Sequence, residues 1–171
     1  MIKIKNNQLG FSLIEVLIAC SIISLSMFAL MSTAQKGLSL SSEALLKSQA
    51  SFLLEEGAEA VKSVRDNNWT TISNLSLNTP YHAFFNTSTN LWVLDTSTTS
   101  LASSVPTYPI DGTFNRTITI YSVSRDANDD ITESGGTLDA GTKKVTVTVS
   151  WVSSNGSNSK SLSFYITNIF N

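Results

Sequence analysis

One carboxylate lies where carboxylates are rare, inside a long apolar stretch of the chain. Residues 11–31 read FSLIEVLIACSIISLSMFALM, and Glu15 is the sole charged residue between Phe11 and Gln35. A charged side chain costs about 2.5–3.5 kcal/mol near the centre of a membrane helix, so it usually has a function and a charged partner. A cut between Gly10 and Phe11 would create an amino group that is positively charged at neutral pH, about one helical turn from such a carboxylate. The residues leave open whether that amine meets Glu15 of its own chain or of a neighbour.

Three simpler interpretations of this segment compete with the ion pair. A cleaved secretory signal would use the small residues Ser32-Thr33-Ala34, but its apolar run is usually only about 7–15 residues long and holds no carboxylate. An ordinary single-pass anchor gains nothing from Glu15. A capping box, Ser12-Leu13-Ile14-Glu15, would satisfy free amides at a helix start and complement the helix dipole. The capping box explains the carboxylate but leaves the apolar span after it unexplained.

At this point the residues match a known pattern. Gly10-Phe11-Ser12-Leu13-Ile14-Glu15, after a short basic leader and before a long apolar run, resembles the type IV prepilin signature shared by pilins and the pseudopilins of type II secretion. The resemblance implies cleavage after Gly10 by a membrane prepilin peptidase, which also N-methylates Phe11. It further implies that Glu15 neutralises the terminal amine of an adjacent subunit during assembly.

Several features of the chain depart from many major pilins. Ser32 stands where many of them carry a helix-kinking proline, so any melting of the helix cannot be assigned to proline, although Gly37 could soften it. Cys20 is the only cysteine, so the C-terminal cysteine pair of many major pilins is absent. We interpret Cys20 as a small apolar side chain, with an intermolecular bridge as the alternative. Residues 55–69 also resemble the end of the long helix in some minor pilins. The absent cysteine pair favours a minor subunit, or a lineage of pilins without that disulfide.

The length and charge of the N-terminal segment predict a membrane span. The run 11–31 is long enough to cross roughly 30 Å of hydrocarbon as a helix. Lys3 and Lys5 precede it without an acidic residue, and the positive-inside tendency therefore places the N-terminus in the cytoplasm. We expect a leader at residues 1–10, a single pass through the inner membrane, and a C-terminal domain outside it. The final location would be a cell-surface pilus or a periplasmic pseudopilus.

A second helical pattern follows, from Ser42 to Asp66. Apolar and small residues recur there at three- and four-residue steps and form one stripe. The stripe consists of Leu46, Ala50, Leu53, Gly57, Val61 and Val64. We therefore expect residues 32–68 to be the amphipathic outer half of one long helix, with its first half in the membrane.

Residues 69–171 have the pattern of a β domain. Strands are predicted at residues 81–86, 91–95, 114–124, 144–152 and 161–169. The residues predicted to face inward are Phe114, Ile118, Ile120, Val145, Val147, Val149, Trp151, Leu162, Phe164 and Ile166. Such alternation is typical of an antiparallel sheet with one buried and one wet face. The sequence thus predicts an α+β fold, with a long N-terminal helix packed on a four- or five-stranded antiparallel sheet, as the pilin resemblance also implies.

The remaining residues that could do chemistry form weaker patterns. Asp126, Asn128 and Asp130 have the two-residue spacing of calcium loops, but the turn glycine and the final glutamate of an EF-hand are absent. We predict a solvated hairpin loop there, with a metal as the weaker alternative. His82 is the only histidine and is expected to be structural. We expect no enzyme and no cofactor, and a net charge of -2 gives no electrostatic case for binding nucleic acid.

The sequence therefore predicts a non-enzymatic structural subunit of a type IV pilus or related pseudopilus. Its expected partners are prepilin peptidase, other pilin subunits through helix–helix packing, and the inner membrane before assembly. The alternative is a monomeric surface-binding module, either membrane-anchored or released after Ala34. The mature N-terminus distinguishes the two: Phe11 for a pilin subunit, against Met1 or Gln35 for the binding module. Pilus, secretion and DNA-uptake systems share the same N-terminal pattern, so the particular system stays open.

Overall fold

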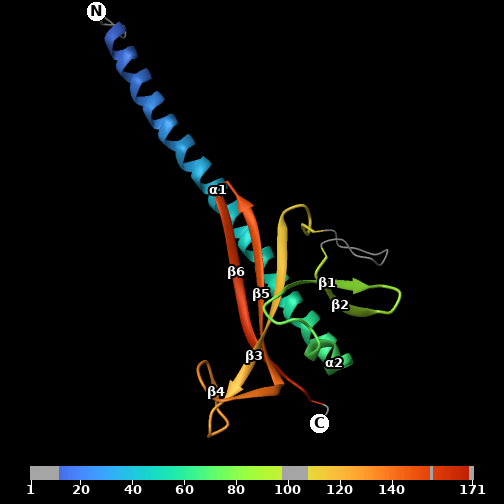
Figure 1. Ribbon diagram of the computed structural model, residues 1–171. Coiled ribbons are helices and arrows are strands. Elements are labelled where there is room, and N and C mark those ends of the chain that lie inside the picture. Colours follow the sequence, from blue (N-terminus) through green and yellow to red (C-terminus); the bar gives the residue numbers. More distant parts are fainter. Residues whose placement is uncertain (1–11, 98–107, 155, 170–171) are drawn as a thin grey trace, which may run out of the picture. The chain divides into compact units, whose positions relative to one another are not determined.

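The computed structural model describes residues 12–97, 108–154 and 156–169 (Figure 1). Its elements in chain order are α1 (Leu13–Asn67), α2 (Trp69–Ser73), β1 (Pro80–Asn86), β2 (Leu91–Asp95), β3 (Phe114–Arg125), β4 (Ile131–Thr132), β5 (Thr137–Ser153) and β6 (Gly156–Thr167). The chain divides into two compact units, Met1–Ala44 and Leu45–Asn171. The first unit holds the beginning of α1, and the second holds the rest of α1 together with the whole sheet.

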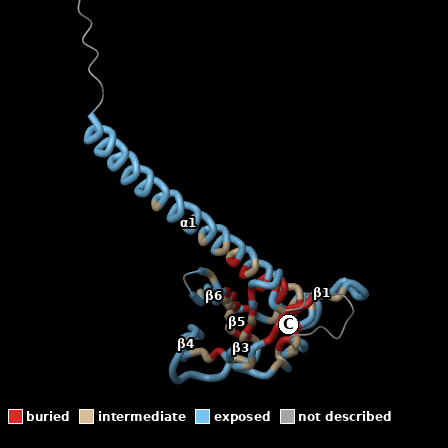
Figure 2. Tube along the Cα trace, turned by 90° about the horizontal axis from the view of Figure 1, so that it is seen from above, coloured by how far each residue is buried: buried red, intermediate tan, exposed pale blue. Residues whose placement is uncertain are grey.

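The described part of the first unit is a helix without a buried core. It contains an 18-residue window that is long and apolar enough to cross a membrane, and none of that window is buried. Figure 2 shows this stretch of α1 as almost uniformly exposed. Large side chains such as Leu25 and Phe28 are 73% and 77% exposed. Nothing within the described chain therefore covers the apolar surface of this helix.

The second unit is built on a six-stranded sheet in which every pairing is antiparallel. The main path has the order β2-β1-β3-β5-β6, and the short β4 pairs with the end of β3 outside this path. The predicted fold class is confirmed. The path contains the five strands that the sequence predicted, and β4 is the one strand that the sequence analysis did not predict.

Residues 45–67 of α1 cover one face of this sheet and form the core with it. The buried helix residues are Ala50, Leu54, Gly57, Ala58, Ala60, Val61 and Val64. Gly57 marks a close approach, because a Cβ atom placed there would lie 2.8 Å from Cγ1 of Val147 and 3.0 Å from Cδ of Arg116. The predicted stripe is therefore the packing face, although Leu46 and Leu53 are only partly buried at its edge.

The faces of the strands follow the predicted alternation, but the core face of β6 is only partly buried. Leu162 was predicted to face the core but is 39% exposed, and Phe164 is only partly buried. The reason is that β6 is an edge strand, with a neighbour on one side only, so its inner face is incompletely covered. Lys160, two residues before Leu162, reaches the helix with its ammonium group 2.7 Å from Oγ of Ser51.

Several boundaries also differ from those that the sequence predicted. β6 begins at Gly156, five residues before the predicted start at 161, and ends at Thr167 rather than at 169. β5 begins at Thr137, seven residues before the predicted start at 144, because residues 137–139 pair with the end of β3 beyond a register shift at Ser122/Val123. The segment after α1 begins with the short helix α2, whose N-cap is Asn68: its side-chain oxygen accepts the backbone N–H of Thr70 at 2.9 Å. The β domain therefore starts with a helical turn.

Candidate processing and assembly site

Glu15 lies in the first turn of α1, at the positive end of the helix dipole. The carbonyl of Ser12 accepts the N–H groups of Glu15 and Val16 at 3.0 and 3.3 Å, so the helix starts directly after Ser12. The Glu15 residue is exposed. A negative charge in this turn complements the helix dipole and leaves the carboxylate open to a cation outside the chain. Gly10 and Phe11 lie outside the described residues.

The hydroxyl groups along the apolar part of α1 are satisfied within the helix. Ser21, Ser24 and Ser26 each donate to the backbone carbonyl four residues earlier, at distances of 2.8, 2.7 and 2.8 Å. The sequence left open whether these groups bond within the helix or between helices, and the structure has them bonded within it. Each of these hydroxyls already donates to an acceptor in its own helix. Burying the helix in lipid or against another helix therefore leaves none of these three donors without a hydrogen bond.

The apolar surface of this helix is too continuous for a helix that remains in water. Exposed large apolar side chains recur from Leu13 to Met31 on all sides of the helix. Soluble monomers rarely expose contiguous apolar patches larger than a few hundred Å². The thiol of Cys20 is part of this surface, exposed and free. We therefore expect lipid or other helices to cover this apolar surface.

The fold and this helix together define a structural class: an α+β, pilin-like fold with a long N-terminal helix on an antiparallel sheet. The family model described as the prokaryotic N-terminal methylation motif matches residues 5–31. The chain therefore carries the signature of type IV pilins and pseudopilins, and the matched residues include Gly10, Phe11 and Glu15. A search of the curated proteins and a search of the solved structures each returned no match to this chain.

The loop between β3 and β4 holds Asp126, Asn128 and Asp130, the residues with calcium-like spacing. Oδ1 of Asp126 accepts the backbone N–H groups of Asn128 and Asp130 at 2.8 and 3.0 Å, and the backbone N–H of Asp126 donates to the Asp130 carbonyl at 2.9 Å. One carboxylate thus holds the turn together. Across residues 12–97, 108–154 and 156–169, no group of three or more His, Cys, Asp or Glu could hold a metal ion. A metal in this loop stays an untested alternative.

His82 lies buried on β1. Its Nδ1 is 3.0 Å from the carbonyl oxygen of Arg116, and its ring centroid is 4.2 Å from that of Tyr108. Burial raises the pKa of the Tyr108 hydroxyl, and the nearby charge of Arg116 lowers it by a smaller amount. This environment fits the structural role that the sequence suggested for His82.

The sequence analysis missed Arg116, which is the most buried charged side chain among the described residues, at 1% exposed. Its Nη1 lies 3.0 Å from Oε2 of Glu56 and donates to the Leu53 carbonyl at 3.2 Å, while Nη2 donates to the Ala83 carbonyl at 3.5 Å. Arg116 therefore joins α1 to β1 and β3. The signal was present in the sequence: Phe114, Ile118 and Ile120 face the core, and a period of two places residue 116 on the same face.

Proposed function

We propose that this chain is a structural subunit, and a minor one, of a type IV pilus or a related pseudopilus. One observation carries the proposal: the methylation motif over residues 5–31 coincides with a helix whose apolar surface nothing in the described chain buries. The β domain supplies the surface that faces outward from the assembly. The subunit itself is non-enzymatic, as is general for this structural class.

In this proposal residues 1–10 are a leader that prepilin peptidase removes by cutting after Gly10. The same enzyme methylates the new amino group of Phe11, which keeps its positive charge. Residues 11–31 hold the subunit in the inner membrane, with residues 69–171 outside. The driving force for assembly is the packing of one α1 against the α1 helices of other subunits.

Glu15 sets the register of that packing. The carboxylate is in the first helical turn, next to the place where the new terminus would lie, and it is exposed. An uncompensated carboxylate in hydrocarbon is costly, so a subunit gains most when the terminal amine of a neighbour meets Glu15. Any sliding of one helix along the other separates the two charges. The correct axial position is therefore favoured over shifted ones.

The mature N-terminus tests the processing step. The full chain is produced together with a prepilin peptidase, and the membrane-bound protein is sequenced by mass spectrometry. We expect a chain that begins at N-methylated Phe11, and we expect Gly10→Val to retain the leader. A native chain that begins at Met1 or Gln35 would favour the monomeric surface module and contradict the proposal.

The role of Glu15 is tested by incorporation into filaments. Glu15→Gln removes the charge and keeps the side-chain size, so we expect normal cleavage and membrane insertion but at least a severalfold loss of incorporation. Glu59→Gln is the matched control, because Glu59 is also exposed on α1, and its ion pair with Lys62 is a surface pair worth little. Equal incorporation of the Glu15 and Glu59 variants would rule out the register role.

A further inference from the structure

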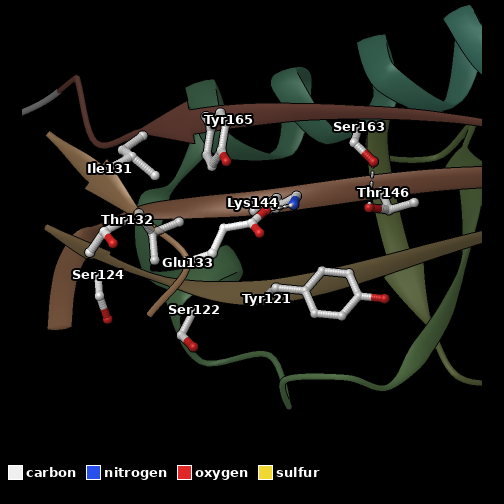
Figure 3. Close-up of a pocket in the computed structure, with 11 residues that line it drawn as sticks. Tyr121, Ser122, Ser124, Ile131, Thr132, Glu133, Lys144, Thr146, Ser163 and Tyr165 are labelled. Atoms are coloured by element: carbon white, nitrogen blue, oxygen red, sulfur yellow. Dashed lines mark hydrogen bonds and ion pairs between the residues drawn. The ribbon is translucent and has the colours of Figure 1, made fainter. Parts of the chain in front are cut away.

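The outer face of the sheet, which α1 does not cover, contains a groove of about 470 Å³ (Figure 3). Its floor is formed by β3, β5 and β6, and β4 with the residue after it forms one wall. The floor residues alternate along each strand with the core residues, so they point away from the helix. The volume falls within the range of sites that bind small molecules, which is about 300–1,000 Å³.

Two tyrosines flank a lysine on the floor of the groove. Tyr121, Lys144 and Tyr165 are directly paired across three neighbouring strands, so the tyrosines are two strand spacings apart, or roughly 10 Å. Both rings are accessible, with Tyr121 36% and Tyr165 46% exposed. In Figure 3 the ring of Tyr121 is seen face-on, whereas the ring of Tyr165 is seen nearly edge-on. The groove thus offers one open aromatic platform and a second aromatic side chain beside it.

The polar groups in the groove are numerous and nearly neutral in sum. The Lys144 ammonium on the floor lies 3.8 Å from Oε1 of Glu133 in the wall, so a donor and an acceptor lie side by side in the groove. The hydroxyls of Thr146 and Ser163 are 2.8 Å apart in the next row of the floor. Each hydroxyl can donate and accept at once, so further hydrogen bonds to a ligand remain possible.

This combination selects the chemistry of the ligand. A fatty chain or an apolar peptide would exclude water from the Lys144 ammonium and from the hydroxyls of Thr146 and Ser163, which is costly. A phosphate or an acidic chain would find a single lysine whose charge Glu133 already balances. A sugar ring has an apolar face for an aromatic platform and hydroxyl groups for a neighbouring donor and acceptor. We propose that this groove binds a neutral oligosaccharide, with one pyranose ring on Tyr121 and the next unit between Lys144 and Tyr165.

The groove lies entirely within residues 121–165 of the second unit, so this inference does not depend on filament assembly. The test uses the full chain in detergent micelles on an array of neutral glucose-, galactose- and mannose-containing oligosaccharides, with sialylated and uronic-acid glycans beside them. A neutral glycan that binds on the array is then titrated by calorimetry. We expect Tyr121→Ala and Tyr165→Ala each to weaken binding about three- to tenfold, because each removes one aromatic contact.

Phe85→Ala is the matched control, since Phe85 is as exposed as Tyr121 but lies on β1 outside the groove. Glu133→Gln keeps the size of the side chain and leaves the Lys144 charge unbalanced, so we expect weaker neutral binding and new binding of acidic glycans. The proposal is overturned if no neutral glycan binds at millimolar concentration, or if only acidic glycans bind. It is also overturned if the two tyrosine variants bind like the Phe85 variant while retaining the thermal stability of the wild type. Loss of self-association in the tyrosine variants without any glycan binding would instead assign the groove to a second copy of this chain.

Discussion

Two regions of α1 have the same secondary structure and opposite relations to the rest of the chain. In the first, up to residue 44, large side chains such as Leu25 and Phe28 are exposed. In the second, from residue 45 to 67, the buried positions are mostly small: Ala50, Ala58 and Ala60, together with Gly57. Small side chains let the helix backbone approach the sheet closely, whereas the long apolar side chains of the first region have no partner within the described chain.

The hydrogen bonds of the two regions also differ in whether they stay within the helix. Serines of the first region return their hydrogen bonds to their own helix, as Ser24 does to the carbonyl of Cys20. In the second region Arg116 of β3 uses its guanidinium to reach the helix, at Glu56 and at the carbonyl of Leu53. These serines are satisfied within their own helix, whereas the second region also shares hydrogen bonds with the sheet. The two regions should respond differently to matched substitutions.

The largest difference is expected when an aspartate is placed in each region. Val61→Asp puts a charge at a site that is fully buried against the sheet, so we expect a loss of about 4 kcal/mol or more in the free energy of unfolding. All three tryptophans, Trp69, Trp92 and Trp151, lie in the second unit, so tryptophan fluorescence during denaturation measures the unfolding of that unit alone.

Leu25→Asp is the matched change in the first region. Leu25 touches no core, so we expect the unfolding curve of the second unit to be unchanged. Membrane insertion should instead weaken by about 2.5–3.5 kcal/mol, because the charge lies inside the apolar run. Fractionation of cell membranes and urea titration give the two readouts. If Leu25→Asp lowered the stability of the second unit as much as Val61→Asp, the distinction between the two regions would be wrong.

The next effect concerns the buried guanidinium that joins the helix to the sheet. Arg116→Ala leaves the Leu53 and Ala83 carbonyls without this donor and opens a cavity, so we expect a loss of about 3–5 kcal/mol in the stability of the second unit. Arg116→Met keeps most of the volume and removes the charge, and should cost less than Arg116→Ala. Urea denaturation followed by tryptophan fluorescence measures both, and a cost for Arg116→Ala below that of Arg116→Met would contradict this role.

Much of this architecture follows from local patterns in the sequence. The period of two in residues 145–151 and the stripe from Leu46 to Val64 predicted which faces meet, and Val145, Val147 and Val149 are indeed fully buried. These predictions succeed because a buried face imposes its period on the residues that form it. The motif at Gly10-Phe11 and Glu15 is equally local, and the family comparison supports it.

What the sequence did not predict depends on contacts between distant residues. Arg116 and Glu56 are 60 positions apart, and nothing near either residue in the chain indicates their 3.0 Å contact. The groove needs the register of three strands, because only pairing brings Tyr121 beside Lys144 and Lys144 beside Tyr165. Leu162 lies on the predicted face of its strand, opposite Val147, but stays 39% exposed because β6 is at the edge of the sheet. Sequence periodicity gives the face of a strand, and only topology gives its coverage.

A smaller effect is expected from the two glycines of α1. Gly57→Val would force a side chain into Val147 and Arg116, since even a Cβ atom would come within 3.0 Å of both, so we expect a loss of about 2–3 kcal/mol. Gly37 has nothing within 4 Å of such an atom. Gly37→Ala should therefore leave the unfolding of the second unit unchanged and favour the helix locally by up to about 1 kcal/mol. Thermal unfolding followed by tryptophan fluorescence measures the stability of the second unit in both variants, and circular dichroism measures helix content. Equal losses of stability in the two variants would argue against close packing at Gly57.

The smallest effect separates the regions by their response to acid. In the second unit the Nε of Arg125 lies 2.7 Å from Oδ2 of Asp139, and this hydrogen bond is the main reason why the pKa of Asp139 is lowered to about 2 from its ordinary 3.8. Because the folded pKa is the lower one, the stabilisation is complete above the pKa of the unfolded state and is lost as pH falls from about 4 towards 2. We expect a decline on the order of 1 kcal/mol over that range, after allowance for solvent screening.

Asp139→Asn keeps the shape of the side chain but cannot ionise, so the variant should be less stable at pH 7 and lose less stability between pH 4 and 2. Asp95→Asn is a suitable control, because the Asp95 carboxylate accepts the backbone N–H of Ser97 at 3.0 Å and lies on the edge strand β2. Urea midpoints from tryptophan fluorescence at pH 7, 4, 3 and 2 provide the comparison. If the stability of the Asp139 variant fell with pH as steeply as that of the wild type, the acid response of the second unit would have to come from other carboxylates. If stability falls less steeply with pH only in the Asp139 variant, the acid response is located where β3 and β5 pair beyond their register shift. That place is far in sequence from the apolar region of α1.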